Sequence, residues 1–155
     1  MCDYCGCRRQ ATIDELSQEH EQLLNVVYRL RRDAARADHA AVVEVLDVEL
    51  APLLRRHTDK EERGLFVQLR DAWSVDGRLA SLEDEHRRIE GLLETVVAGG
   101  ASWRDALVCL GDELSEHIFD EETDLFPYAM YELSDGQWSA VEQVHANARI
   151  EVTVS

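Results

Sequence analysis

The chain has 155 residues, a length that fits one domain with a sizeable buried core. Its 16 Lys and Arg against 32 Asp and Glu give a net charge of −16, which disfavours nucleic-acid binding because that binding needs clustered Lys and Arg. No apolar run approaches the length of a membrane-spanning helix, and the N-terminal residues lack the apolar segment of a secretory signal. These features predict a cytoplasmic protein that binds neither nucleic acid nor a membrane.

Three of the four cysteines lie close together at the N-terminus. Cys2, Cys5 and Cys7 form Cys-x-x-Cys-x-Cys within residues 1–11, which we interpret as a cysteine-rich leader. Thiols this close could hold zinc, copper or iron, could cycle through a disulfide, or could simply be exposed in a loose segment. Cys109 falls within an apolar helical pattern and is expected to be a small core residue.

Apolar residues then recur at helical spacing in two successive stretches. Thr12-x-x-Glu15 is a capping box that is expected to begin the first helix, whose apolar stripe is Ile13, Leu16, Leu23, Leu24, Val27 and Leu30. The pattern breaks near Asp38, which could cap a second helix with the stripe Val43, Leu46, Leu50, Leu54 and Leu65. Pro52 lies inside this stripe and is expected to kink the helix or to mark a late start.

Two further stretches follow a turn at residues 74–77. The third helix is expected to end at Gly99-Gly100 and carries Leu79, Leu82, Ile89, Leu93 and Val96. The fourth follows a cap at Ser102-x-x-Asp105, is bent or ended by Pro127, and carries Leu107, Leu110, Leu114 and Leu125. Ser134-x-x-Gln137 is expected to cap a short C-terminal helix that contains Trp138, Val141 and Val144.

Four long helices with short connections predict an all-α fold, an antiparallel four-helix bundle with a short extra C-terminal helix. No alternating strand pattern of any length occurs before the final residues 150–154. We assign residues 12–131 to the bundle and residues 132–155 to the C-terminal helix and tail.

A ten-residue pattern occurs twice in the chain. The segment at 57–66, HTDKEERGLF, recurs as HIFDEETDLF at 117–126, and a Glu-His pair precedes each copy, at 19–20 and 85–86. A His and a Glu four residues apart share one face of a helix. The chain therefore contains two copies of one unit, and each copy supplies one His followed by a His-x-x-x-Glu.

These histidines fall on the apolar stripes of the expected helices. Each of the four helices presents one histidine on its buried face, and two also present a glutamate: His20, His57 with Glu61, His86, and His117 with Glu121. An ionised carboxylate is costly to bury, by several kcal/mol as an order of magnitude, unless it is paired or bound to metal. No Lys or Arg is expected inside beside them, so the pattern predicts a pair of metal ions, with iron, manganese or zinc suited to imidazole and carboxylate ligands.

Simpler interpretations account for one such position but not for four helices together. A single His-x-x-x-Glu could be a surface pair worth a few tenths of a kcal/mol, roughly. A lone histidine on an apolar face is commonly a hydrogen-bonded core residue. His39 and His145 lie off the pattern, and we expect both to be solvent-exposed.

The order His20, His57-x-x-x-Glu61, His86, His117-x-x-x-Glu121 resembles the hemerythrin, or HHE cation-binding, domain. Glu-Glu-x-x-Leu-Phe and the Leu-Phe-Pro at 125–127 are also typical of that family, and the resemblance covers about residues 12–130. It implies an up-down-up-down bundle around a non-haem centre of two iron ions. By the same resemblance, His20 and His57 would bind one iron, His86 and His117 the other, and Glu61 and Glu121 would bridge them.

The sequence departs from the oxygen-carrying hemerythrins at two places. They have His-x-x-x-His on the third helix, whereas Glu90 stands at that offset from His86, so that one iron has either fewer ligands or an additional carboxylate. They also use a longer His-to-Asp spacing on the fourth helix. Glu122 occupies that offset but points well round the helix from His117, so we prefer Glu121. Anionic ligands favour ferric iron, which disfavours simple reversible O₂ carriage.

The resemblance is closer to hemerythrin-like proteins of prokaryotes, some of which have a cysteine-rich leader, and to iron-sensing F-box proteins. The leading hypothesis is thus a di-iron protein that reacts with O₂, peroxide or nitric oxide, with decomposition of H₂O₂ as its enzymatic form. The alternative is a module that senses or stores iron or O₂ without turnover.

Two other classes of function fit the sequence less well. A ferritin-like carboxylate site would use Glu83-x-x-His86 and Glu142-x-x-His145, but it leaves the repeat unexplained. A metal-free structural bundle would keep the histidines as hydrogen-bonded core residues.

Overall fold

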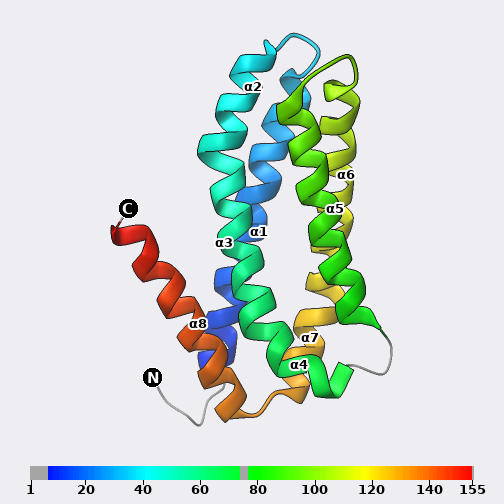
Figure 1. Ribbon diagram of the computed structural model, residues 1–155. Helices are drawn as coiled ribbons and strands as arrows, with labels where there is room; N and C mark the ends of the chain where they lie inside the picture. The colour runs from blue at the N-terminus through cyan, green and yellow to red at the C-terminus, as the bar shows by residue number, and fades with distance from the viewer. Residues whose placement is uncertain (1–6, 74–76, 155) are drawn as a thin grey trace.

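The computed structural model describes residues 7–73 and 77–154, and these form helices without any strand (Figure 1). In chain order the α-helices are α1 (Cys7–Asp33), α2 (His39–Val45), α3 (Ala51–Lys60), α4 (Phe66–Trp73), α5 (Arg78–Ala98), α6 (Trp103–Asp120), α7 (Phe126–Glu132) and α8 (Asp135–Val154). The segments α2–α4 and α6–α7 each run without a break, so the bundle consists of four long helical segments that alternate in direction. The predicted four-helix bundle with an extra C-terminal helix is confirmed. No helix among the described residues is long and apolar enough to cross a membrane.

The apolar core consists of two separate clusters along the bundle axis. One cluster contains Leu23 of α1 and Leu114 of α6, and the other contains Leu16 of α1 and Leu125. His20 lies between Leu16 and Leu23 in the sequence, and the other three predicted histidines lie between the two clusters in the same way. The bundle therefore places a polar layer between two apolar ones.

Three π-helical turns join the α-helices of the two long segments. They span Leu46–Leu50, Glu61–Leu65 and Glu121–Leu125. Pro52 and Pro127 each lie in the first turn of the α-helix that follows a π turn, where a missing N–H is tolerated. The helix continues through both prolines, so the expectations that Pro52 marks a late start and that Pro127 ends its helix are wrong.

The helix ends agree with the sequence at most positions. Gly99, with φ 79°, ends α5, and α6 begins after Ser102. The capping box before α8 is confirmed, because the backbone N–H of Ser134 donates to Oε1 of Gln137 at 3.0 Å and the N–H of Gln137 donates to Oγ of Ser134 at 3.4 Å. The helix that it begins is longer than expected, at 20 residues.

Two local expectations are wrong. The first helix begins at Cys7 and not at Thr12, so Glu15 lies in the helix interior, where it pairs with Lys60 at 2.7 Å. Cys109 is exposed and not a core residue, since it lies on the outward face of α6. Cys2 and Cys5 lie outside the described residues, so the interpretation of the leader stays a prediction.

α8 packs beside only one half of the bundle. It contacts α1, α3 and the turn Glu61–Leu65, whereas α5 and α6 lie on the other side (Figure 1). Gly64 faces α8, and a Cβ at this position would lie 3.4 Å from Cγ1 of Val141, in ordinary van der Waals contact. The half of the chain that contains the first repeat is thus covered by an additional helix.

A glycine on α6 sets the distance between α1 and α6. A Cβ at Gly111 would lie 2.9 Å from Cγ1 of Val27 and would overlap the side chain of Arg31. We expect Gly111→Ala to lower the free energy of unfolding by about 1–3 kcal/mol, because the stiff, buried Val27 must move to make room. Urea unfolding of the two proteins measures the difference.

Gly91→Ala is the matched control, since Gly91 is an exposed helical glycine of α5 and no described atom lies within 4 Å of its added Cβ. Helix propensity alone predicts that this substitution stabilises the protein by up to about 1 kcal/mol. A stabilisation of similar size in both variants would show that α1 and α6 are not closely packed at Gly111.

Candidate metal centre

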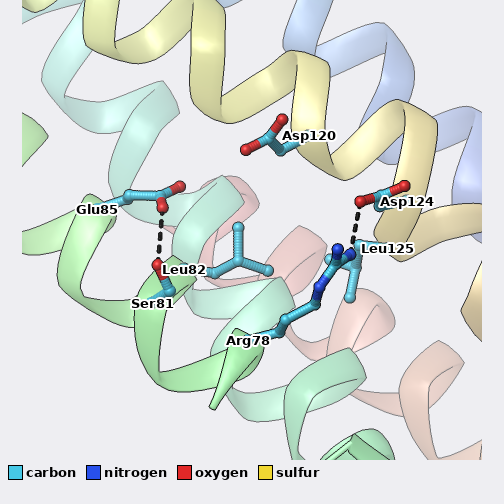
Figure 2. A pocket seen from close by; sticks show the side chains of 7 residues that line it. All are labelled: Arg78, Ser81, Leu82, Glu85, Asp120, Asp124 and Leu125. Carbon is cyan, nitrogen blue, oxygen red and sulfur yellow. Dashed lines mark hydrogen bonds and ion pairs between the residues drawn. The ribbon is translucent and has the colours of Figure 1, made fainter. Parts of the chain in front are cut away.

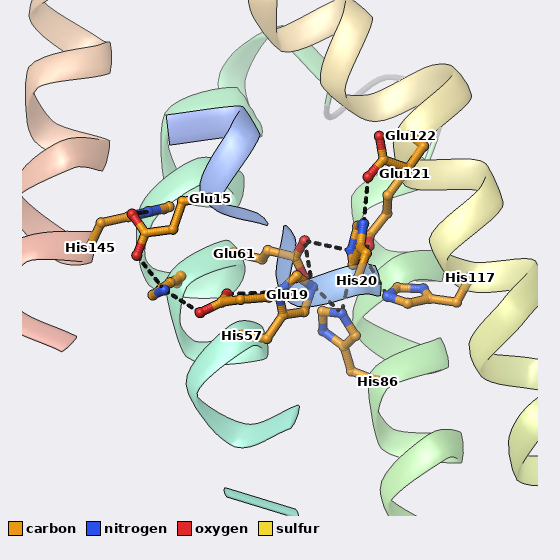
Figure 3. A network of polar contacts seen from close by, with 11 residues as sticks. Glu15, Glu19, His20, His57, Glu61, His86, His117, Glu121, Glu122 and His145 are labelled. Carbon is orange, nitrogen blue, oxygen red and sulfur yellow. Dashed lines mark hydrogen bonds and ion pairs between the residues drawn. The ribbon is translucent and has the colours of Figure 1, made fainter. Parts of the chain in front are cut away.

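The six side chains that the sequence singles out meet in the polar layer of the bundle (Figure 3). α1, α3, α5 and α6 each contribute one histidine, and the first residues of two π turns contribute the glutamates; the six are His20, His57, His86, His117, Glu61 and Glu121. All six are buried, and both glutamates are fully so, with an exposed fraction of 0%. The repeat therefore converges on one place from four helices.

The six residues divide into two groups that share the same glutamates. In the first group His20 and His57 lie with Glu61 and Glu121, and in the second His86 and His117 lie with the same pair. One ligand atom from each member lies within 4.8 Å of the others in its group. Each group could hold one metal ion. We call the first group position 1 and the second group position 2.

Each glutamate directs one oxygen toward each position. Glu61 places Oε1 3.2 Å from Nε2 of His57 at position 1, and it places Oε2 3.3 Å from Nε2 of His86 at position 2. Glu121 repeats this arrangement, with Oε2 3.2 Å from Nε2 of His20 and Oε1 3.3 Å from Nε2 of His117. This is the arrangement that bridging carboxylates need.

These inward atoms have no hydrogen-bond partner among the described residues. They are Nε2 of all four histidines and both side-chain oxygens of Glu61 and Glu121. A buried polar atom without a partner costs about 1–3 kcal/mol, and a charged one costs more. Eight such atoms in two convergent groups fit a pair of cations, which would satisfy all of them at once.

Four further carboxylates fix the orientation of the histidine rings. Each Nδ1 donates to one of them: His20 to Glu122 at 2.7 Å, His57 to Glu19 at 3.1 Å, His86 to Glu62 at 2.8 Å and His117 to Glu85 at 2.9 Å. A carboxylate accepts but does not donate, so the N–H lies on Nδ1 and Nε2 faces the centre. Partners of this kind are typical of metal-binding histidines, and we call these four residues the outer carboxylates.

The outer carboxylates were not among the predicted site residues, although the sequence contains a signal for them. Each of them adjoins a residue of the centre, as Glu19 adjoins His20 and Glu62 adjoins Glu61. Neighbouring residues on a helix point about 100° apart, so the outer carboxylate of each pair points toward the adjacent helix while its neighbour points to the centre. The repeated phenylalanines also have a role, because Phe66 stacks on His86 and Phe126 stacks on His20, with ring centroids 5.7 and 5.4 Å apart.

A buried lysine lies next to the centre, contrary to the expectation that no Lys or Arg points inward. Lys60 is 2% exposed, and its ammonium donates to Oε1 of Glu15 at 2.7 Å and to Oε1 of Glu19 at 2.5 Å. Glu15 also accepts from Nδ1 of His145 at 3.2 Å. The sequence did not reveal this because Lys60 lies off the apolar stripe and its two carboxylate partners belong to α1, which is remote in sequence.

Both histidines that were expected to be exposed are at least partly buried. His145 is 1% exposed, because α8 docks it against Glu15. His39 is half-buried; its Nε2 lies 2.7 Å from the backbone oxygen of Val96, and its ring lies beside that of Trp103. Both expectations are wrong because tertiary contacts supply partners that are remote in sequence.

The other candidate ligands lie outside the two groups. Glu90 is exposed on α5 and belongs to neither group. The described residues contain no further cluster of His, Cys, Asp and Glu of this kind. Glu83 pairs with Arg70 at 3.1 Å, and neither His145 nor Glu142 belongs to a group. The structure thus brings the repeated residues together and not the Glu-x-x-His pairs of a ferritin-like site.

The two shared glutamates differ in protonation when no metal is bound. Burial raises the pKa of Glu61, but the charge of His57 outweighs it and holds the pKa well below its ordinary value. Burial and the charge of Glu61 raise the pKa of Glu121 well above its ordinary value. Burial lowers the pKa of His57, but the charge of Glu61 outweighs it and raises the pKa to about 9. In the metal-free centre a proton therefore resides on Glu121 in preference to Glu61, and His57 is protonated at neutral pH.

The raised pKa of His57 predicts that the metal-free protein loses stability in alkaline solution. This contribution is fully present below the ordinary histidine pKa of about 6.5 and is lost as the pH rises through about 9, with a size of about 1–3 kcal/mol. Thermal unfolding of chelator-treated protein between pH 6.5 and about pH 10 measures the loss. His57→Gln should remove most of the pH dependence, whereas a wild-type stability that stays level or rises over this interval would contradict the assignment.

A family model described as the hemerythrin HHE cation binding domain matches residues 11–129 of the chain. Neither a curated protein nor a solved structure gives a significant match. The matched segment runs from α1 into α7 and contains all six residues of the centre, while α8 lies beyond it. With most of its length matched and its repeated histidines and glutamates gathered in one buried layer, the chain belongs to the hemerythrin HHE cation-binding family.

Proposed function

We propose that the centre holds two iron ions and reacts with O₂, hydrogen peroxide or nitric oxide, and that its main activity is decomposition of H₂O₂. The observation that carries this proposal is the set of buried nitrogen and oxygen atoms without hydrogen bonds, divided into two groups that share Glu61 and Glu121. His20 and His57 would hold one iron, and His86 and His117 the other. This arrangement and the membership of the family both support a site for two metals.

The proposed redox chemistry favours iron over zinc. Each position offers two imidazole nitrogens and two carboxylate oxygens, which suit iron, manganese and zinc alike. Zinc is satisfied by four ligands and has no redox chemistry. Iron accepts further ligands and changes its oxidation state, so the same four donors leave room for a small molecule to bind. Manganese is the closer competitor.

The chain contributes orientation and exclusion of water. The outer carboxylates hold all four Nε2 atoms toward the centre, and Phe66 and Phe126 cover the rings of His86 and His20. Because the centre is buried between two apolar clusters, only small molecules fit as reagents. A bound iron pair supplies storage for two electrons, so that one H₂O₂ is reduced to two water molecules with two protons and a second H₂O₂ returns both electrons and protons as it leaves as O₂.

Removal of one histidine should remove metal and stability together. We expect His57→Ala to lose most of its iron and to melt at a lower temperature than the iron-loaded wild type, because metal bound only by the folded state adds to its stability. Elemental analysis and thermal unfolding, with and without a chelator, provide the measurements. Glu90→Ala is the control and should keep its iron, since Glu90 is exposed and outside both groups. An unchanged iron content in His57→Ala would contradict the ligand assignment.

Peroxide should be decomposed by the iron-loaded protein. After anaerobic loading with ferrous iron, addition of H₂O₂ is expected to give O₂ at half the amount of peroxide consumed, together with a change in the ligand-to-iron absorption bands. Glu61→Ala should abolish both responses, and Glu90→Ala should not. A reversible spectral change without O₂ release would instead support the sensing or storage of iron or O₂, and no response at all would exclude both functions.

A further inference from the structure

The two positions have the same kinds of ligand but unlike surroundings. Within the repeat, Lys60 of the first copy corresponds to Asp120 of the second, and Gly64 corresponds to Asp124. The first difference lies close to the centre, because Lys60 directly precedes Glu61 and Asp120 directly precedes Glu121. The internal symmetry therefore ends just outside the ligands.

The surroundings of position 1 contain a buried positive charge. The ammonium of Lys60 lies 2.5 Å from Oε1 of Glu19, and Oε2 of the same carboxylate accepts from Nδ1 of His57. One carboxylate thus connects the lysine to a residue of position 1. The side chain of Lys60 is 3% exposed, so solvent screens its charge only weakly. α8 completes the cover through His145, which donates to Glu15.

The carboxylate beside position 2 has exposed partners instead of a buried ammonium. Glu85, which accepts from His117, receives a hydrogen bond from Oγ of Ser81 at 3.1 Å, and the guanidinium of Arg88, which is 54% exposed, lies 3.9 Å away. A cleft of about 180 Å³ adjoins this carboxylate, and Figure 2 shows Asp120 at the same cleft. Solvent therefore screens the positive charge near position 2, whereas the charge of Lys60 near position 1 is buried.

These surroundings act on a bound cation in opposite directions. A positive charge in a poorly screened interior repels a divalent ion and weakens its binding at the nearer position. The ammonium on Glu19 also draws negative charge away from the oxygen that His57 contacts, which reduces the basicity of that ring toward a metal. Glu85 loses less of its charge to a cation, because Arg88 lies 3.9 Å away and is exposed to solvent. Both effects favour position 2.

We propose that Lys60 makes the two metal positions unequal, so that a divalent ion fills the position of His86 and His117 before that of His20 and His57. Lys60 acts as a positioning residue through Glu19 and is not itself a ligand. This inference rests on the proposed function, in which the six residues hold two metal ions.

Manganese provides a direct test in the wild-type protein, because Mn²⁺ is stable in air as the divalent ion and gives an anomalous diffraction signal. Crystals of the full chain grown with one equivalent of Mn²⁺ should show anomalous density at position 2, and crystals with an excess should show it at both. Density first at position 1, or equal density at both with one equivalent, would overturn the inference while supporting the two-metal site. Absence of density at both positions in excess Mn²⁺ would contradict the proposed function itself.

Substitution of the lysine tests the cause. Titration of the wild type with Mn²⁺ should give two steps, and Lys60→Met should tighten the weaker step by at least about tenfold, which corresponds to about 1.4 kcal/mol. Arg63→Met is the matched control, since it removes the same charge from an exposed residue nearby that pairs with Asp59. It should change neither step. If both substitutions change the weaker step equally, or if a folded Lys60→Met protein leaves it unchanged, the role of Lys60 is overturned. If Lys60→Met does not fold, the order in which Mn²⁺ fills the two positions in the wild-type crystals decides.

Discussion

Two glutamates face each other in the dry middle of the bundle, and the rest of the structure is arranged around that constraint. Glu61 and Glu121 are fully buried, and their side-chain oxygens have no hydrogen-bond partner among the described residues. Two adjacent carboxylates cannot both be ionised there without opposite charge, which is why the metal-free centre retains protons. The proposed pair of metal ions would remove the conflict more completely, because it would satisfy both acids and all four imidazoles.

The remaining residues of the repeat support these two acids. The outer carboxylates adjoin residues of the centre in both copies: Glu19 and Glu85 precede a histidine, and Glu62 and Glu122 follow a shared glutamate. Each of the four accepts from the Nδ1 atom of one ring. The phenylalanine that ends each copy stacks on a ring of the centre. A π turn begins at both shared glutamates, and only the second is followed by a proline, so proline is not a general cause of these turns. Such turns frequently occur at functional sites, where they change the direction of a side chain relative to an α-helix.

The symmetry of the centre is not shared by the whole molecule. α8 packs on the half of the bundle that contains the first repeat, where Lys60 and His145 are buried, while the arginine beside Glu85 in the other half is exposed. Two equal sets of ligands therefore lie in different electrostatic surroundings. Under the proposed function such a difference would be useful, because two unlike positions can hold ions of unlike charge.

The sequence by itself determined the helices, their order and the six convergent residues, because helical spacing and the repeat are local patterns that one chain displays in full. His20 and His86 could be placed on buried faces from their neighbouring leucines alone. The partners of the rings, the burial of Lys60 and His145, and the exposure of Cys109 and Glu90 were decided only by the tertiary structure. The reason is physical: periodicity shows which face of a helix points inward, but the partner of a polar side chain depends on which other helix packs against that face and at what height along the bundle.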